Sequence, residues 1–290
     1  AEVASPVQKE TIEALISFYN TGDLKEYDRF NILWVQDTAS MVDFVNGFTE
    51  VYGDPLGYKA SWEAMVNFKD MDATRRTEII SANAQWFEDH SPIQEKYRKK
   101  EVKGVSAKVI NAAILGGDCY PATPIGINLP NADWIRKDYG SKSVTIQNIT
   151  QAYAESSKGN GFIEEFIFRP EDRERITLYG TIGDNMHTDL HECLGHGSGQ
   201  LAPGVKGDEL KQYGSVLEEA RADLFSLYYM ADPKMEELGL LPDAEVAKAQ
   251  YASYISNGMM TQLARVELGK DIEQTHMRNR KMISEWAYEL

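Results

Sequence analysis

The stretch His191–His196, which reads His-Glu-Cys-Leu-Gly-His, constrains this chain more than any other. Each imidazole can give a divalent metal ion a neutral ring nitrogen, and the glutamate between them can take a proton from a metal-bound water. This pattern is typical of a zinc hydrolase. Two unrelated histidines are the commoner explanation of such a pair, but two of only five histidines in the chain flank this one glutamate.

The spacing of the two histidines predicts a local departure from the α-helix. They are five residues apart, which on an ideal helix leaves them about 140° out of line. A one-residue bulge would realign them, and Gly195 is a residue that tolerates one. His187 lies four residues before His191, the usual helical spacing of a metal pair. Because no glutamate follows it, we interpret His187 as structural.

A second cluster, residues 218–223, reads Glu-Glu-Ala-Arg-Ala-Asp and opens a run with apolar residues at helical spacing. The run therefore predicts a buried helix, where unpaired charges are costly. One glutamate can complete a set of three metal ligands, and other acids can accept the second N–H of the ligating imidazoles. The alternative is a solvated helix face with an internal ion pair.

Together the two clusters resemble the dipeptidyl peptidase III family, which has His-Glu-x-x-Gly-His followed by Glu-Glu-x-Arg-Ala and then Glu or Asp. Three further segments agree with that family: residues 48–57, 124–131 and 276–280. The resemblance runs from about residue 40 to the C-terminus. Full-length members are more than twice this size, so we expect the chain to be an internal fragment.

The resemblance implies one Zn²⁺ per chain, bound by His191, His196 and Glu219, with one position left for water. Glu192 is then the general base, which afterwards passes its proton to the leaving amine. The implied activity is that of a zinc-dependent exopeptidase that releases dipeptides from the N-terminus of oligopeptides.

The same resemblance assigns supporting roles to four more residues. Glu218 and Asp223 would orient the two zinc-binding imidazoles. His276, as a catalytic residue, and Arg280, as a substrate-binding residue, would steady the substrate or the developing oxyanion, where a preorganised donor is effective.

Three residues are implied to bind the free amino end of the peptide: Asp43, Asn128 and Asn131. Without the resemblance, the two asparagines would be interpreted as simple turn-formers. The match around Asp43 is loose, because Val45 falls roughly where animal members have a tyrosine.

Composition limits the partners. The net charge of −15 and a pI near 4.8 argue against nucleic acid and against anionic membrane surfaces, whereas a cationic peptide amino terminus would be attracted. No apolar run is long enough to span a bilayer. Cys119 and Cys193 are the only cysteines, so no disulfide framework exists and the compartment is undecided. We expect a cytoplasmic location, with a periplasmic or secreted one left open.

We expect a mainly α fold with a minor β component. Residues 59–103 have a helical pattern, whereas residues 43–52 and 105–115 are predicted strands. The family's two-lobed architecture implies a helical zinc-binding lobe from residues 57–103 and 146–290, and a partial, β-containing second lobe from residues 1–56 and 104–145.

Two other classes of function stay open. A zinc endopeptidase would share the metal chemistry but would also accept peptides with an acetylated amino terminus. A non-catalytic zinc-binding fragment would hold the metal without turnover.

Overall fold

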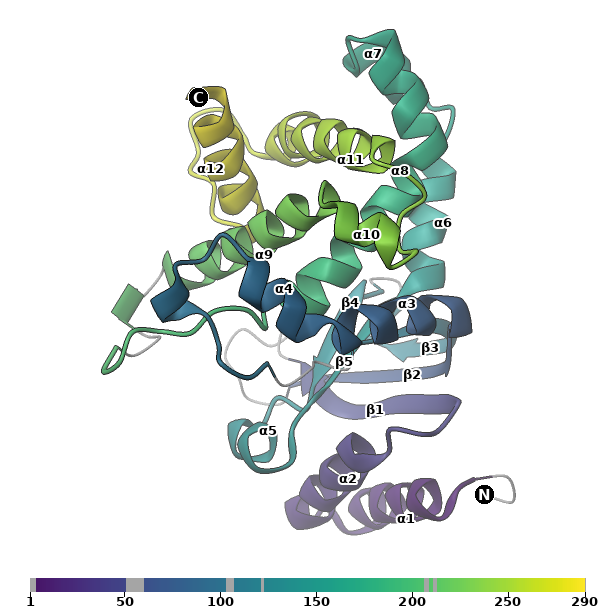
Figure 1. Ribbon diagram of the computed structural model, residues 1–290. Coiled ribbons are helices and arrows are strands. Elements are labelled where there is room, and N and C mark those ends of the chain that lie inside the picture. Colours follow the sequence, from purple (N-terminus) through teal and green to yellow (C-terminus); the bar gives the residue numbers. More distant parts are fainter. Residues whose placement is uncertain are drawn as a thin grey trace. The chain divides into compact units, whose positions relative to one another are not determined.

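The computed structural model describes residues 4–50, 60–102, 107–120, 123–205, 209–210 and 213–289, so most of the predicted motif segment 48–57 lies outside the described residues. The fold is mainly α with one five-stranded sheet, as expected from the sequence (Figure 1). The chain forms two compact units. A sheet unit comprises Ala1–Thr74 and Ala107–Tyr153, and a helical unit comprises Arg75–Ser106 and Ala154–Leu290.

The sheet unit contains the strands β1–β5 and the helices α1, α2 and α5. Its elements are α1 (Pro6–Thr21), α2 (Leu24–Gln36), β1 (Val42–Glu50), β2 (Ser61–Lys69), β3 (Ala107–Gly117), β4 (Gly126–Leu129), α5 (Asp133–Tyr139) and β5 (Lys142–Ile146). Two helices cross the boundary between the units, α3 (Met71–Ala82) and α6 (Gln147–Ser157).

Local sequence signals account for the first helix. The Ser5 side chain accepts a hydrogen bond from the Gln8 backbone N–H at 3.1 Å, and Pro6 occupies the first turn. These residues satisfy the helix N-terminus. Gly22, with φ of 69°, ends the helix in the left-handed conformation and donates its N–H to the Phe18 carbonyl.

The sheet has the strand order β1-β2-β3-β5-β4, in which only the β3–β5 pair is parallel. The helical interpretation of residues 59–103 is wrong for Ser61–Lys69, which form β2 between β1 and β3. Burial alternates along this strand, with Glu63, Met65 and Asn67 buried and their neighbours more exposed. Such a period of two is the signature of a strand.

The core of the sheet unit lies between α2 and the sheet. It joins buried apolar side chains from α1, α2 and all five strands, among them Leu15, Phe30, Trp34, Val45, Met65, Ile110, Leu129 and Ile146. Burying each of these large side chains contributes about 1.5–3 kcal/mol to folding. This core fixes the strands that carry Asp43 and Asn128.

The helical unit contains the two predicted metal-site motifs. Its elements are α4 (Ala84–His90), η1 (Glu95–Tyr97), α7 (Phe162–Phe166), α8 (Pro170–Leu190), η2 (His191–Gly195), α9 (Gly214–Met230), α10 (Pro233–Glu237), α11 (Glu245–Ser256), η4 (Asn257–Gln262), η5 (Leu263–Arg265) and α12 (Thr275–Glu289). Of these, η2 and η4 are π-helical turns.

Helix α8 packs closely along α11 (Figure 1). Gly183 faces α11 here, and a Cβ there would lie 3.4 Å from Gln250 Cβ and 3.7 Å from the Val246 carbonyl oxygen. The N-terminal part of α8 is tied to the start of α11 by two polar contacts. The Tyr179 hydroxyl donates to Asp243 at 3.0 Å, and Arg175 forms an ion pair with Glu245 at 2.5 Å.

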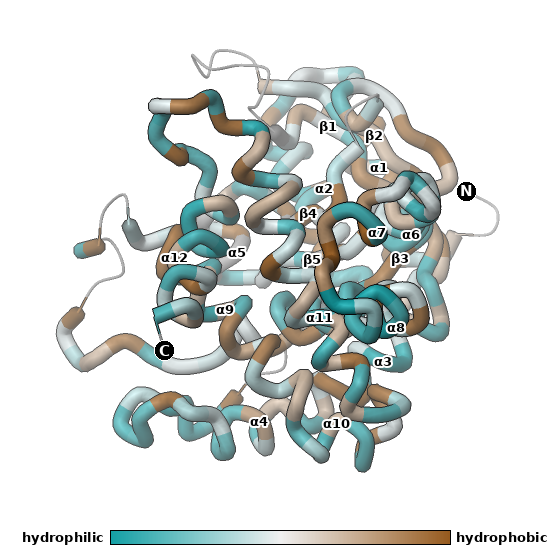
Figure 2. The backbone as a smooth tube through the Cα atoms, turned by 90° about the horizontal axis from the view of Figure 1, so that it is seen from above, coloured by the Kyte–Doolittle hydropathy of each residue, from teal (hydrophilic) through white to brown (hydrophobic). Residues whose placement is uncertain are grey.

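Hydrophobic and hydrophilic positions alternate along the helices, as Figure 2 shows. No helix among the described residues is both long and apolar enough to cross a membrane.

Candidate metal centre

The predicted departure from the α-helix is confirmed. Helix α8 ends at Leu190, and His191–Gly195 continue it as a single π-helical turn. The His196 backbone N–H donates to the His191 carbonyl at 3.1 Å, a bond that spans five residues. The extra residue in the turn brings the two imidazoles together, with ring centroids 4.6 Å apart and planes at 87°.

Gly195 is required for a reason other than the one expected. Its φ does not lie in the left-handed region, so the turn itself does not demand glycine. Instead, a Cβ at Gly195 would lie 2.8–2.9 Å from Cα, Cβ and the carbonyl oxygen of Ala222. The glycine therefore lets the π-turn touch the backbone of α9, which carries the acidic cluster.

The ligand atoms of three residues lie close together: His191 and His196 at the π-turn, and Glu219 on α9. Nε2 of His191 lies 3.2 Å from Glu219 Oε2, and Nε2 of His196 lies 4.0 Å from the same oxygen. Ligand atoms of these three residues all lie within 4.8 Å of one another. Glu219 Oε2 is buried and is in hydrogen-bonding geometry with no group among the described residues. Two nitrogens and a carboxylate oxygen without a hydrogen bond are a donor set that fits a metal ion.

Two other acids of α9 hold the far sides of the same imidazoles. His191 Nδ1 lies 2.8 Å from Asp223 Oδ1, and His196 Nδ1 lies 3.1 Å from Glu218 Oε1. A carboxylate at Nδ1 fixes the tautomer that leaves Nε2 available and sets the ring orientation. Both contacts are those expected of residues that orient metal ligands.

The electrostatics of the centre follow from this pairing. Burial alone would lower the pKa of His191, but Asp223 and Glu219 raise it to about 10. Burial would raise the pKa of Glu219 and of Asp223, yet the neighbouring imidazoles hold both pKa values well below their usual range. In the metal-free chain an imidazolium at His191 therefore balances the buried carboxylates, and a metal ion would have to displace its proton.

The remaining candidates of the helical unit surround this point. Glu192 is half-buried on the π-turn itself, and its charge adds to the rise in the pKa of His191. His276, on α12, places Nε2 3.4 Å from Glu219 Oε2. Arg280 follows one turn later, with its guanidinium over the Tyr254 ring at 4.7 Å.

Two charged residues that the sequence interpretation gave no specific role secure the loop after the second histidine. Arg221 donates to Glu218 Oε1 at 2.6 Å and to the Ser198 hydroxyl at 2.7 Å. Glu88, only 1% exposed, accepts the Gly199 N–H at 2.9 Å. Arg221 could have been found from its place in the acidic cluster, but nothing in the local sequence distinguishes Glu88 from a surface glutamate.

The three residues expected to bind the peptide amino end lie in the sheet unit. Asp43 already forms an ion pair with buried Lys142 at 2.8 Å and accepts the Trp34 indole N–H at 3.0 Å. Asn131 donates its side-chain amide to the Thr49 carbonyl at 2.8 Å. The backbone of Asn128 lies in β4 opposite Ser143, and its side chain lies outside the described part of the structure.

Side chains of the helical unit that the structure describes line two notable cavities. One, of about 720 Å³, extends from His196, Glu218 and Arg221 to the apolar side chains of Ile93 and Leu217. His196 and the acid at its Nδ1, Glu218, line this cavity, whereas His191 and Glu219 do not.

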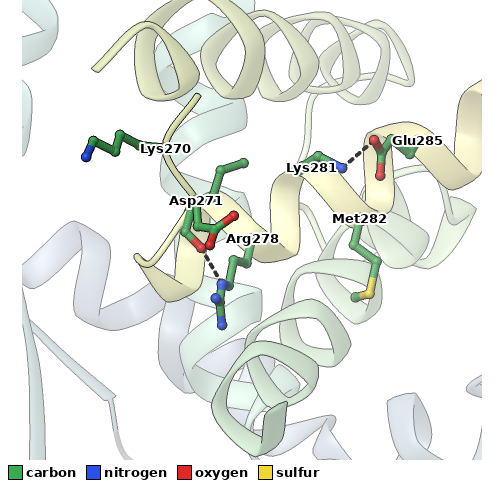
Figure 3. Close-up of a pocket in the computed structure, with 7 residues that line it drawn as sticks. Lys270, Asp271, Arg278, Lys281, Met282 and Glu285 are labelled. Carbon is green, nitrogen blue, oxygen red and sulfur yellow. Dashed lines mark hydrogen bonds and ion pairs between the residues drawn. The ribbon is translucent and has the colours of Figure 1, made fainter. Parts of the chain in front are cut away.

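The second cavity, of about 520 Å³, lies along α12 and is shown in Figure 3. Of its two lysines, Lys281 is paired with Glu285, and Arg278 donates to the Ile272 carbonyl. None of the candidate site residues lines this second cavity.

A π-turn with a His-Glu-x-x-x-His pattern, next to acids of a second helix, gives a group of side chains that could hold a metal ion. The family model described as "Peptidase family M49" matches residues 1–210. The chain therefore belongs to peptidase family M49, a family of metallopeptidases.

Individual relatives agree with this family. Nudix hydrolase 3 of Arabidopsis thaliana is 28% identical over 262 residues, which cover 88% of this chain and 32% of that protein. Dipeptidyl peptidase 3 of Rattus norvegicus is 28% identical over 202 residues, 69% of this chain and 26% of that protein. The chain thus spans roughly a quarter to a third of the length of these curated relatives.

A solved structure has the same fold. The DPP III from Caldithrix abyssi superposes with a TM-score of 0.80 at 24% identity, over 98% of this chain and 52% of that one.

Proposed function

We propose that this chain carries the catalytic centre of a zinc-dependent exopeptidase that releases dipeptides from the N-terminus of oligopeptides. The observation that carries the proposal is the convergence of two Nε2 atoms on a buried Glu219 oxygen that has no hydrogen bond to any described residue, while a carboxylate contacts each Nδ1. Family membership supports peptide substrates.

The donor set favours zinc. Catalytic zinc sites use three protein ligands of nitrogen and oxygen type and keep a fourth position open. His191, His196 and Glu219 supply this set, and the hard oxygen-rich environment preferred by Ca²⁺ or Mg²⁺ is absent among the described residues that converge there. When bound, Zn²⁺ would polarise the scissile carbonyl and make water acidic enough to attack at neutral pH.

The chain's own residues would transfer the proton, orient the imidazoles and bind the substrate. Glu192 would take the proton of the attacking water and deliver it to the leaving amine. Asp223 and Glu218 would keep both imidazoles in the tautomer with a free Nε2. His276 is close enough to Glu219 to donate to an oxyanion that develops beside the metal position, and Arg280 would bind the substrate.

Release of dipeptides requires groups that hold a free α-ammonium two residues from the scissile bond. We propose Asn128 and Asn131 for this role, on the family resemblance. Asp43 could join them only by exchanging Lys142 for the substrate's ammonium, because the two side chains form an ion pair in the free chain. An acetylated amino end would leave such acceptors unpaired, at a cost of about 1–3 kcal/mol.

Metal analysis combined with two peptides tests the proposal. We expect one zinc per chain, loss of zinc in Glu219→Gln, and retained zinc with almost no turnover in Glu192→Gln, because removing the base costs rate and not metal. A dipeptidyl-naphthylamide with a free amino group should be cut, and its acetylated form should not.

Each alternative predicts a different result. Equal cleavage of both peptides would support the endopeptidase, and zinc binding without cleavage of either would support the non-catalytic fragment. Loss of metal in Glu192→Gln would place Glu192 among the ligands.

A further inference from the structure

Asp223, the acid at Nδ1 of His191, also contacts two residues that the two sequence motifs do not contain, His187 and Tyr254. It is 3% exposed, and its Oδ1 is approached by both His191 Nδ1 and His187 Nε2, at 2.8 and 3.0 Å. Its other oxygen, Oδ2, accepts the Tyr254 hydroxyl at 2.7 Å. Tyr254 is buried near the C-terminal end of α11, far from both motifs in sequence.

The Tyr254 hydroxyl is suited to act only as a donor to this carboxylate. Burial, followed by the charge of Asp223, raises the pKa of Tyr254 above its ordinary value, so the phenol keeps its proton. Its single proton can serve one acceptor, and Asp223 at 2.7 Å is closer than Asn279 Oδ1 at 3.2 Å.

Asn279 completes the chain of polar contacts. It lies on α12 and is 0% exposed, and its Nδ2 has no hydrogen-bond partner among the described residues. Rotating the amide by 180° exchanges its oxygen and nitrogen, which have nearly the same shape. Nδ2 would then donate to the Tyr254 oxygen, which gives this buried donor a partner and leaves the phenol proton for Asp223.

The ring of Tyr254 has a second contact. The Arg280 guanidinium lies 4.7 Å from the ring centroid, in cation–π geometry. Arg280 Nη1 also donates to Asn257 at 2.7 Å, which fixes the guanidinium from another side. Tyr254 therefore contacts both Asp223, which orients the proposed metal ligand His191, and Arg280, a proposed substrate-binding residue.

We propose that Tyr254 is a positioning residue with two separable actions: its hydroxyl holds Asp223 against His191, and its ring face holds Arg280. This inference rests on the proposed function for its consequences in catalysis, but its first action concerns only the geometry of His191. The two actions can be removed one at a time, because phenylalanine keeps the ring and leucine keeps neither group.

Zinc affinity tests the hydroxyl. In Tyr254→Phe we expect the zinc affinity of the chain, measured by competition with a chromophoric chelator, to fall about tenfold or more, as for other groups that support metal ligands. In an Asp223→Ala background the same substitution should have no further effect, because the hydroxyl acts through that carboxylate. Tyr251→Phe is the matched control: Tyr251 lies on the same helix and donates to the Leu227 carbonyl, so its loss should leave zinc affinity unchanged.

Kinetics test the ring. With zinc at saturation, Tyr254→Phe should keep the KM of the parent, whereas Tyr254→Leu should raise KM severalfold by releasing Arg280. A purely structural role would move both variants together. Asn279→Ala provides a milder second test of the hydroxyl, with a fewfold loss of zinc affinity, should Tyr254 variants fold poorly.

A measurement on the metal-free chain separates this inference from the proposed function. In nitrogen-15 spectra of the histidine rings, the His191 Nδ1 proton should exchange slowly with water in the parent and at least several times faster in Tyr254→Phe. If the parent binds no zinc, the proposed function fails while this readout still decides the role of Tyr254. Unchanged proton exchange, or unchanged zinc affinity in a zinc-binding parent, would overturn the inference.

Discussion

Replacing Gly195 by alanine tests whether contact between the π-turn and α9 builds the metal centre. The added Cβ would lie 2.8–2.9 Å from three atoms of Ala222, two of them backbone atoms. Comfortable carbon contacts are about 3.5–4.0 Å, so the turn and the helix must separate by roughly 0.7 Å or more. No rotamer change can relieve this contact, because alanine has none.

The separation has a cost in stability and in metal affinity. Overpacking of this kind costs about 1–3 kcal/mol, and we expect the melting temperature of Gly195→Ala to fall by about 2–4 °C for each kcal/mol. His191 and His196 lie on the π-turn, whereas Glu219 lies on α9. Pushing these elements apart should therefore also weaken zinc binding by about ten- to a hundredfold, the range seen for disturbed ligand orientation.

A second glycine provides the control. Gly180 is also a buried helical glycine, on α8, but a Cβ there would meet only Ile176 Cγ2 at an ordinary 3.5 Å. Gly180→Ala should be neutral or stabilising by up to about 1 kcal/mol, with zinc affinity unchanged. If Gly195→Ala melts and binds zinc like Gly180→Ala, the close-contact argument is wrong.

Three further predictions concern the charges of the centre. Because the metal-free chain holds a proton on His191 up to a pKa of about 10, zinc affinity should rise about tenfold per pH unit between pH 7 and 9; a flat profile in chelator competition would contradict it. The same raised pKa gives the metal-free chain stability that is fully present below about pH 6.5 and is lost as the pH rises through about 10, which thermal melts across that range would reveal. Arg221→Ala should lower stability by about 1–3 kcal/mol, because Glu218 and the Ser198 hydroxyl lose their donor. Arg221→Lys should restore only part of this stability. If the alanine variant is as stable as the parent in denaturant melts, Arg221 does not hold the loop that contains Ser198.

Much of the helical part of the fold could be predicted, because its signals are local. Ser5, Pro6 and Gly22 mark the ends of α1 without reference to any other element. Strand β2 could not be recognised in the same way. Its apolar residues Trp62, Met65 and Val66 have the i, i+3, i+4 spacing of a helix, and only pairing with β1 and β3 makes this segment a strand.

The metal centre shows the same division between local and long-range information. The five-residue spacing of His191 and His196 cannot be met by an α-helix, so the π-turn followed from the sequence alone. The contact of Gly195 with Ala222, and the approach of Tyr254 to Asp223, join segments 27–31 residues apart. No periodicity encodes these contacts, because they depend on how α8, α9 and α11 pack.

The spacing of the acids on α9 explains why the π-turn has its particular length. Glu219 and Asp223 are four residues apart, which on a helix places their side chains on one face with Cβ atoms about 5–6 Å apart. An imidazole between them can face one acid with each ring nitrogen, as His191 does, with Nε2 toward Glu219 and Nδ1 toward Asp223.

His196 lies in the same way between Glu219 and Glu218. These two acids are consecutive in sequence, so their side chains point about 100° apart around the helix. The two rings must therefore approach Glu219 from different sides, as their interplanar angle of 87° reflects. A regular α-helix through His196 would turn its ring away from α9 altogether. The extra residue of the π-turn therefore places the His196 ring where Glu219 and its neighbour Glu218 each face one ring nitrogen. Moving the carboxylate of Glu218 one position away from Glu219 should leave His196 Nδ1 without this contact, even with every proposed ligand in place.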